Sequence, residues 1–237
     1  MLFSRQEVAD FVNRSFEPVW ESVRPVPLVR IDFGNGTVIN RTLHGNIATY
    51  VCNADGQVLD ILPCIYTPRV YVNRLNQLRL LASYAEQAGK DQREARLKDY
   101  HQRLLDALSK NEAPPVFRAN PAGMTKARIE SSATVLVAGS RVQVKPAAAA
   151  VKPDPDPKLA STEDLASWKE LAEDTRQNET VRRRQVHAML AARGMVKPEA
   201  ITKRLYKEVL HSDLDDPYLG LGKTLFANYP FSEDKVH

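Results

Sequence analysis

The spacing of apolar residues near the start of the chain changes from helical to strand-like. Apolar residues recur at helical intervals after the capping box Ser4-x-x-Glu7, which predicts a helix from about Arg5 to Arg14. Phe16 to Val23 then predicts a strand, in which Pro18 requires an edge or a starting position because proline has no amide hydrogen. The chain is therefore expected to open with a helix followed by a strand.

Two hairpins are predicted next. Leu28 to Phe33 and Thr37 to Leu43 flank a Gly-Asn-Gly tripeptide, which tolerates the positive φ angles of a tight turn. Gly45 to Cys52 and Gln57 to Leu62 flank Asn53-Ala54-Asp55-Gly56 in the same way. Apolar residues occupy both alternating sets of positions in this second hairpin, so we expect it to be covered on both faces.

Helical spacing returns at Thr67-Pro68, where Thr67 is the predicted N-cap and Pro68 the first helical residue. The apolar stripe of this helix consists of Val72, Leu75, Leu78, Leu80, Leu81 and Tyr84. After a break at Gly89 the pattern continues to Leu108. The helical region is thus expected to extend to the end of the first half.

These patterns divide the chain into three parts. Residues 1–112 predict an α/β domain with a long C-terminal helical extension. Residues 113–160 hold seven prolines and eleven alanines and predict a semi-rigid, extended linker, with a short hairpin of Val135–Val137 and Val142–Val144 as an alternative inside it. Residues 161–237 predict a small all-α unit of about three helices, which begin near Ser161, Lys197 and Asp216.

Composition excludes several classes of protein. No apolar run approaches the ~20 residues that a membrane-spanning helix needs, and the first residues lack the pattern of a secretory signal, so we expect a cytoplasmic protein without membrane contact. The formal charge of +4 arises entirely in 113–160, where seven basic residues face three acidic ones. Because both flanking parts are nearly neutral, we expect no nucleic-acid partner, and we interpret Arg182 to Arg184 as a solvated helix face.

The order of elements resembles the thioredoxin-like fold family over residues 4–85. Glu7 to Val19 is similar to the helix and strand that follow the redox site in that family, Ile47 to Asp60 to its third and fourth strands with their Asp-Gly turn, and the helix from Pro68 to its last helix. The resemblance implies a thioredoxin-like α/β domain at the N-terminus. The hairpin from Leu28 to Leu43, however, stands where the family has a helix.

The chain departs from this family at its redox site. The family's first strand and its Cys-x-x-Cys motif would precede Ser4, and its cis-proline would stand where this chain has His44-Gly45-Asn46. The chain is therefore expected to be either a noncatalytic thioredoxin-like protein or a fragment, shortened at its N-terminus, of a thiol-disulfide oxidoreductase whose cysteines lie upstream of Met1.

The two cysteines do not replace the missing motif. If the second turn is centred on Ala54 and Asp55, Cys52 faces Gln57 and Cys64 faces Gly45, about 23 Å apart along the strands at ~3.3 Å per residue. A disulfide needs Cα atoms within ~7 Å. We therefore predict two free thiols, with Cys52 as a small buried apolar residue.

Other candidate sites have simpler structural explanations. Gly222-Lys223-Thr224 imitates a phosphate-binding loop, but Pro217 stands where that loop needs its first glycine. His211 with Asp213, Asp215 and Asp216 offers metal ligands, although a turn with Asp216 as an N-cap explains the aspartates equally well. The remaining histidines, His44, His101, His187 and His237, have no nucleophile close by in the sequence.

Carboxylates and tryptophans give no further site. Glu21, Asp60 and the other carboxylates form no recognisable acid/base pair, and Trp20 and Trp168 lie in apolar patterns that predict core positions. No catalytic, cofactor or metal residue is therefore assigned, and no cofactor is expected.

The leading prediction is a noncatalytic binding or structural module. Its helical tail carries many apolar residues for a unit of its size, so the tail should pack on a second surface: the first domain, another copy of the chain or a foreign protein. Metal or nucleic-acid binding by the tail, through His211 or Arg182 to Arg184, is the remaining hypothesis.

We predict that the chain has no disulfide reductase activity, because it holds no vicinal pair of thiols. An insulin-reduction assay with dithiothreitol as the electron source should give the rate of a buffer control. Turnover that disappears in Cys52→Ser or Cys64→Ser would contradict this prediction.

Overall fold

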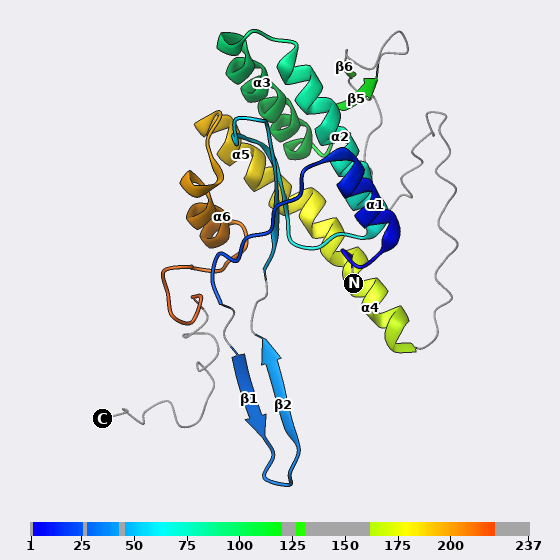
Figure 1. The fold of residues 1–237 in the computed structure, drawn as a ribbon, viewed down its shortest axis with the longest axis vertical. Coiled ribbons are helices and arrows are strands. Elements are labelled where there is room, and N and C mark those ends of the chain that lie inside the picture. The colour runs from blue at the N-terminus through cyan, green and yellow to red at the C-terminus, as the bar shows by residue number, and fades with distance from the viewer. Residues whose placement is uncertain (1, 26–27, 43–45, 120–126, 131–161, 221–237) are drawn as a thin grey trace.

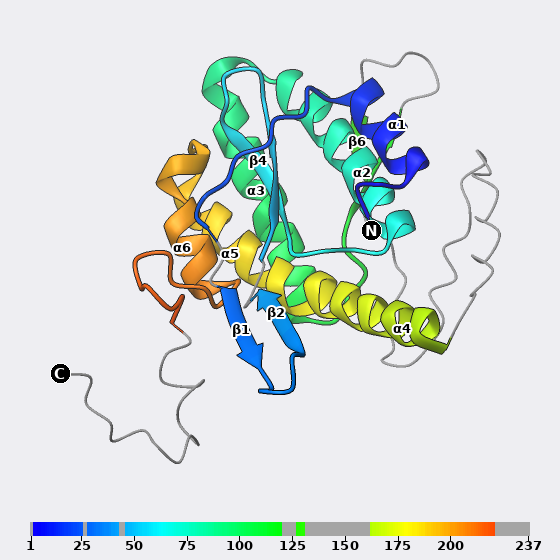
Figure 2. The same ribbon diagram turned by 60° about the horizontal axis from the view of Figure 1, so that its bottom comes forward.

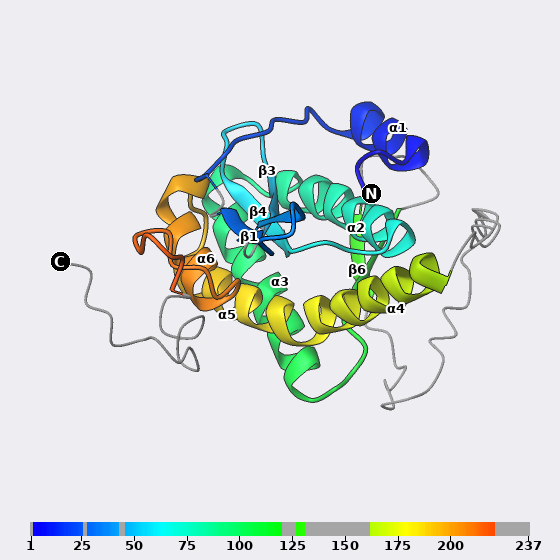
Figure 3. The same cartoon turned by 90° about the horizontal axis from the view of Figure 1, so that it is seen from below.

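The computed structural model describes residues 2–25, 28–42, 46–119, 127–130 and 162–220 (Figure 1). The described strands form three separate two-stranded antiparallel hairpins. Helices surround the middle hairpin, which is the centre of the molecule (Figures 2 and 3). None of the described helices has both the length and the apolar character needed to cross a membrane.

The first predicted helix is confirmed as α1 (Gln6–Ser15), which packs on α2 (Pro68–Glu86). The strand predicted from Phe16 to Val23 is wrong, since residues 17–25 form no strand. The segment passes near β3 but does not pair with any described strand, and Pro18 lacks an amide hydrogen to donate. The core position predicted for Trp20 is also wrong, because its side chain is 83% exposed.

Both predicted hairpins are confirmed, but they have different surroundings. The first, β1 (Leu28–Asp32) with β2 (Val38–Thr42), extends away from the helices as an arm (Figure 1). The second, β3 (Ala48–Cys52) with β4 (Val58–Pro63), lies among the helices, and every residue of β4 is buried. The expectation of a strand covered on both faces is therefore confirmed for β4.

The predicted register of the second hairpin is wrong by one residue at Cys52 and by two residues from Val51 to the start of β3. The Asn53 amide donates to the Gln57 carbonyl and closes a three-residue loop, in which Gly56 has a φ of +74°. A bulge between Val51 and Cys52 then shifts the pairing once more. As a result, Cys52 lies opposite Val58, and the Cys64 amide bonds to the Ile47 carbonyl at 2.7 Å.

The helix predicted from Pro68 is α2, with Thr67 at its N-cap position, and the predicted break at Gly89 separates it from α3 (Lys90–Ser109). The linker prediction is wrong for its first part, because 113–160 contains β5 (Val116–Ala119) and β6 (Ala127–Glu130). Phe117 of β5 is buried and exchanges two hydrogen bonds with the Gln77 side chain. The alternative hairpin at 135–144 lies outside the described residues.

Helices near Ser161 and Lys197 are confirmed in the tail. The first comprises α4 (Thr162–Gln177), a π-helical turn η1 (Asn178–Arg182) and α5 (Arg183–Arg193), which follow one another as a long rod (Figure 3). It ends at Gly194, whose φ is +72°. A short 3-10 turn η2 (Pro198–Ala200) and α6 (Thr202–Glu208) form the second. Of the third, only turns up to Gly220 are described.

Two hydrophobic cores meet at β4. Leu59 and Leu62 belong to a core formed with α1, α2, α3 and Phe117, whereas Val58 and Ile61 belong to a core formed with α5 and α6. The described part of the tail therefore packs on the first half of the chain, which was one of its three predicted surfaces. Residues such as Leu190, Ile201 and Leu205 are completely buried there.

Candidate functional site

The candidate site lies on the open edge of β4. The Cys64 amide bonds to the Ile47 carbonyl just before β3, so by antiparallel alternation the backbone groups of Asp60 and Leu62 face β3, while those of Ile61 face away from it. Leu59 is the extra residue at the bulge, where this alternation is interrupted. No described strand pairs with this second edge. Because β4 is buried, these backbone groups need hydrogen-bond partners other than solvent.

Buried polar side chains supply these partners. Asp60, in the middle of β4, accepts a hydrogen bond from the Ile61 amide at 2.8 Å through Oδ1. His101 of α3 forms a hydrogen bond with the backbone of Leu59. Farther along the edge, the Val58 amide donates to the Val196 carbonyl at 2.8 Å. Side chains and a loop thus take the place of a neighbouring strand.

Asp60 forms a buried ion pair with Arg183, the first residue of α5. Arg183 Nη2 donates to Asp60 Oδ2 at 2.9 Å, and the two side chains are 3% and 0% exposed. The Tyr100 hydroxyl of α3 donates to the same oxygen at 3.2 Å. One carboxylate therefore connects β4, α3 and α5.

Two histidines continue this network. His187 lies one helical turn after Arg183, and its Nε2 is 3.0 Å from Arg183 Nη2. His187 Nδ1 is 3.0 Å from Nδ1 of His101. Both rings are buried, and both touch the Tyr100 ring edge-on, with centroids 6.0 and 4.9 Å from it.

The guanidinium determines the tautomers of both rings. Arg183 Nη2 can only donate hydrogen bonds, so His187 Nε2 must accept. The proton of a neutral His187 therefore resides on Nδ1. That proton points at His101 Nδ1, which must accept in turn, and the proton of His101 resides on Nε2. One chain of donors and acceptors thus runs from Arg183 through both imidazoles.

Proximity alone would make this cluster a metal site. Donor atoms of Asp60, His101 and His187 all lie within 4.8 Å of one another, and no other such group occurs in the described parts of the chain. A metal-bound neutral His187 would, however, carry its proton on Nε2, directly against the Arg183 donor. The guanidinium also brings a positive charge to the site, so these residues do not fit a cation.

The pKa values follow from burial and from the ion pair. Burial lowers the pKa of His101 to about 4, and it lowers the pKa of His187 well below its ordinary value, so both rings are neutral at pH 7. Burial works to raise the pKa of Asp60, but the charge of Arg183, together with the hydrogen bond from the Ile61 amide, outweighs burial and lowers that pKa, so the carboxyl is ionised. The network therefore has two opposite charges and two neutral rings.

A second ion pair, half-buried, lies beside the first. Arg74 of α2 donates through Nε to Glu179 Oε2 at 2.8 Å, and Glu179 belongs to the π-helical turn η1. In the same turn, Asn178 donates from its side chain to the Ile65 carbonyl at 2.8 Å. The π-helical turn therefore attaches the rod to α2 and to the loop before it, just ahead of Arg183.

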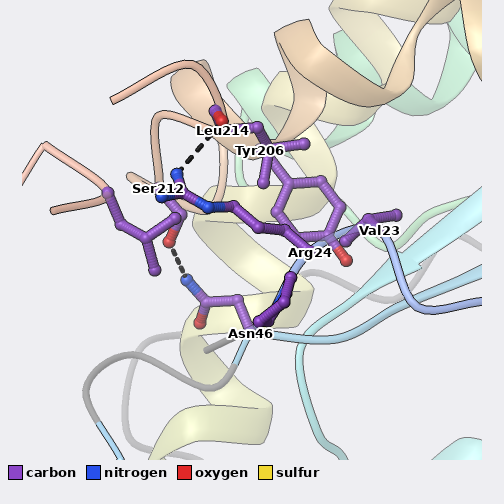
Figure 4. A pocket seen from close by; sticks show the side chains of 8 residues that line it. Val23, Arg24, Asn46, Tyr206, Ser212 and Leu214 are labelled. Atoms are coloured by element: carbon purple, nitrogen blue, oxygen red, sulfur yellow. Dashed lines mark hydrogen bonds between the residues drawn. The ribbon is translucent and has the colours of Figure 1, made fainter. Parts of the chain in front are cut away.

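A small pocket lies between the segment after α1 and the end of the tail. Figure 4 shows Arg24 reaching the Leu214 carbonyl, at 3.1 Å, and the Asn46 amide bonded to Ser212 Oγ, at 2.6 Å. Arg24 also donates to the carbonyls of Asp216 and Pro217. The pocket has a volume of about 30 Å³, which is room for a few water molecules and too little for a substrate.

The other candidate residues are not brought together into a site. Asp213 and Asp215 pair with Lys207 and Lys203, and Asp216 accepts from the Tyr218 amide, as the turn interpretation predicts. His211 is exposed. Gly222-Lys223-Thr224, His44 and His237 lie outside the described residues.

The cysteines are both free, with Cys52 exposed and Cys64 half-buried. The burial predicted for Cys52 is therefore wrong. Burial nevertheless raises the pKa of both thiols, and Arg182 only partly offsets this at Cys64. Both groups are thus poor nucleophiles at neutral pH.

Sequence reasoning missed the central network. A solvated face was predicted for Arg182 to Arg184, but Arg183 is buried and Arg182 bonds to Asn178 Oδ1. The sequence pattern also assigned Asp60 to no acid/base pair, whereas Asp60 forms an ion pair with Arg183. A usable signal existed, since Arg183 shares a helical face with Val186 and Leu190, and Asp60 interrupts an otherwise apolar strand.

Comparisons of the chain with protein-family models, with curated proteins and with solved structures found no match.

We predict that Arg183→Met destabilises the protein by about 3–5 kcal/mol, because it leaves the Asp60 carboxylate buried without its partner. Chemical denaturation at pH 7 measures this free energy. Arg184→Met, at the exposed neighbouring position, is the matched control and should change the free energy of unfolding by less than about 0.5 kcal/mol. Equal effects of the two variants would rule out a structural role for the ion pair.

We also predict that the protein loses stability as the pH falls from 7 to 5. The folded-state pKa values of His101 and His187 lie below the unfolded value of about 6.5, so the unfolded chain binds protons first. Each imidazole that stays neutral in the folded protein should lower the free energy of unfolding by about 2 kcal/mol between pH 7 and pH 5.

Denaturation curves at pH 7 and pH 5 measure this change. His101→Gln combined with His187→Gln should reduce the pH dependence, whereas His211→Asn, at an exposed position, should preserve it. A free energy of unfolding that stays constant from pH 7 to pH 5 would refute neutral buried histidines.

Proposed function

We propose that this chain is a noncatalytic thioredoxin-like module that binds protein through the arm formed by β1 and β2. The observation that carries the proposal is the uncovered apolar face of this arm. The order of α1, the β3–β4 hairpin and α2 supports the thioredoxin-like part, since these three elements are among those that resemble that family, although the strand expected after α1 does not form.

One face of the arm is apolar. Ile31 and Ile39 are opposite each other in the register, so their side chains lie on the same face, and Phe33 follows two residues after Ile31. Ile31 is 43% exposed and Phe33 56%. A folded surface rarely leaves such residues together in solvent without a binding role.

The arm also lacks what a stable hairpin needs. Two strands alone are marginal in water, and stability normally requires a third strand or a layer packed on the apolar face. β1 and β2 contact each other along their length, whereas no helix in the described part of the chain packs extensively on either strand. A protein that packs on this face would supply the missing layer.

The rest of the described molecule favours binding over catalysis. The Asp60 network is buried, the pocket beside Arg24 has a volume of only about 30 Å³, and burial raises the pKa of both free thiols. Apolar residues of the tail are used inside the second core, so the arm replaces the tail as the proposed interaction element. Two free cysteines also fit the reducing environment of the cytoplasm.

We predict that a hydrophobic dye such as bis-ANS binds the native protein through the arm. Ile31→Thr combined with Phe33→Ser should lower the dye fluorescence to about half or less, because these substitutions remove the apolar face. Asn40→Ser, on the opposite face, is the matched control and should leave the fluorescence unchanged. Equal fluorescence in all three proteins would overturn the proposed docking face.

A further inference from the structure

The edge of β1 carries a pattern of charges that fits a second copy of itself. Arg30 and Asp32 lie on the same face of the strand, two residues apart, with Ile31 between them on the other face. Both charged side chains are exposed, and their nearest approach within one chain, Arg30 Nη2 to Asp32 Oδ2, is a loose 3.8 Å. Each is thus available to a partner.

We propose that two copies of this chain associate by antiparallel pairing of their β1 edges, with the two-fold axis at Ile31. This inference rests on the proposed binding role of the arm and assigns a second copy of the chain to the edge of β1. The paired arms form one four-stranded sheet in the order β2, β1, β1 of the partner and β2 of the partner.

Backbone hydrogen bonding permits this register. The Phe33 amide donates to the Thr37 carbonyl at 3.1 Å, so by alternation the backbone groups of Ile31 also face β2. Those of Arg30 and Asp32 therefore face outward, where no described strand meets them. In the pairing centred on Ile31, Arg30 of one copy and Asp32 of the other exchange their backbone hydrogen bonds, twice over.

Charge selects this register over its neighbours. A two-fold axis at Ile31 puts each Arg30 opposite Asp32 of the other copy, so two oppositely charged cross-strand pairs form. An axis at Arg30 or at Asp32 would instead put like charges opposite each other. Pairing of two β2 edges would form no such charge pairs, since an axis at Ile39 puts the uncharged residues Val38 and Asn40 opposite each other.

The same charges explain why the edge does not pair indiscriminately. Charged residues on an edge strand discourage association with most other strands, because the charges would lose water without gaining a partner. Only a strand with the reversed order of charges satisfies both of them. An antiparallel copy of β1 meets this requirement by symmetry.

Sedimentation velocity of the full chain at rising concentration tests the association directly. The weight-average mass should rise from 26.6 kDa toward twice that value. Arg30→Glu puts a carboxylate opposite Asp32 in both pairs and should weaken the dimer about tenfold or more. The double reversal Arg30→Asp with Asp32→Arg restores opposite charges and should restore the dimer.

Cysteine cross-linking tests the register. In a Cys52→Ser, Cys64→Ser background, Ile31→Cys puts a thiol at the two-fold axis, where paired Cα atoms lie about 4.5 Å apart, close enough for a disulfide between copies. Mild oxidation should therefore yield a covalent dimer. Ile39→Cys, on the same face but on β2, is the matched control and should yield little.

Two results would overturn the inference: a chain that stays monomeric up to its solubility limit, or equal cross-linking through Ile31→Cys and Ile39→Cys. The first result combined with dye binding that depends on the arm would reject self-pairing and leave the proposed docking face intact. Loss of both signals would reject the proposed function as well.

Discussion

The fold depends on the way in which the buried open edge of β4 is satisfied. A two-stranded hairpin in the middle of a protein exposes backbone amides and carbonyls to an apolar interior, and such groups are costly when unpaired. Here Asp60 and His101 bond to the backbone of Ile61 and Leu59. Because the Asp60 carboxylate brings a negative charge into the core, it needs a buried cation, which Arg183 of α5 supplies. The second core is then built around this ion pair.

This constraint also explains the shape of the tail. Arg183 and His187 stand one helical turn apart on α5, and the π-helical turn directly before Arg183 carries Glu179, which binds Arg74 of α2. The rod is thus attached to β4 and to α2 by charged groups, while apolar side chains fill the space around them. Removing either charge of the Asp60–Arg183 pair leaves the other charge buried without a partner, so the two halves of the chain depend on each other.

Local pattern was sufficient for most elements but not for their mutual arrangement. The Gly-Asn-Gly turn, Thr67-Pro68 and Gly194 mark boundaries through backbone geometry, which a sequence displays directly. The register of β3 with β4 depended on a bulge at Val51 and Cys52, and Trp20 is exposed in a segment that forms no strand in spite of its apolar pattern. The network joins residues 60, 101, 183 and 187, whose meeting is a property of tertiary packing alone. What the sequence did contain was the anomaly of Asp60 in an apolar strand.

The same requirement, that strand edges be paired, has opposite outcomes at the two hairpins. At β4 the edge is buried, and polar side chains and the backbone of Val196 satisfy its hydrogen bonds from within the chain. At β1 the edge and one apolar face stay in solvent, so the backbone groups of Arg30 and Asp32 are hydrated rather than bonded to protein. At β4 most polar groups are bonded within the chain, although Arg183 Nη1 has no partner, whereas the hydrated groups of the arm can exchange water for a binding partner. That difference is the physical reason for assigning binding to the arm and stability to the network.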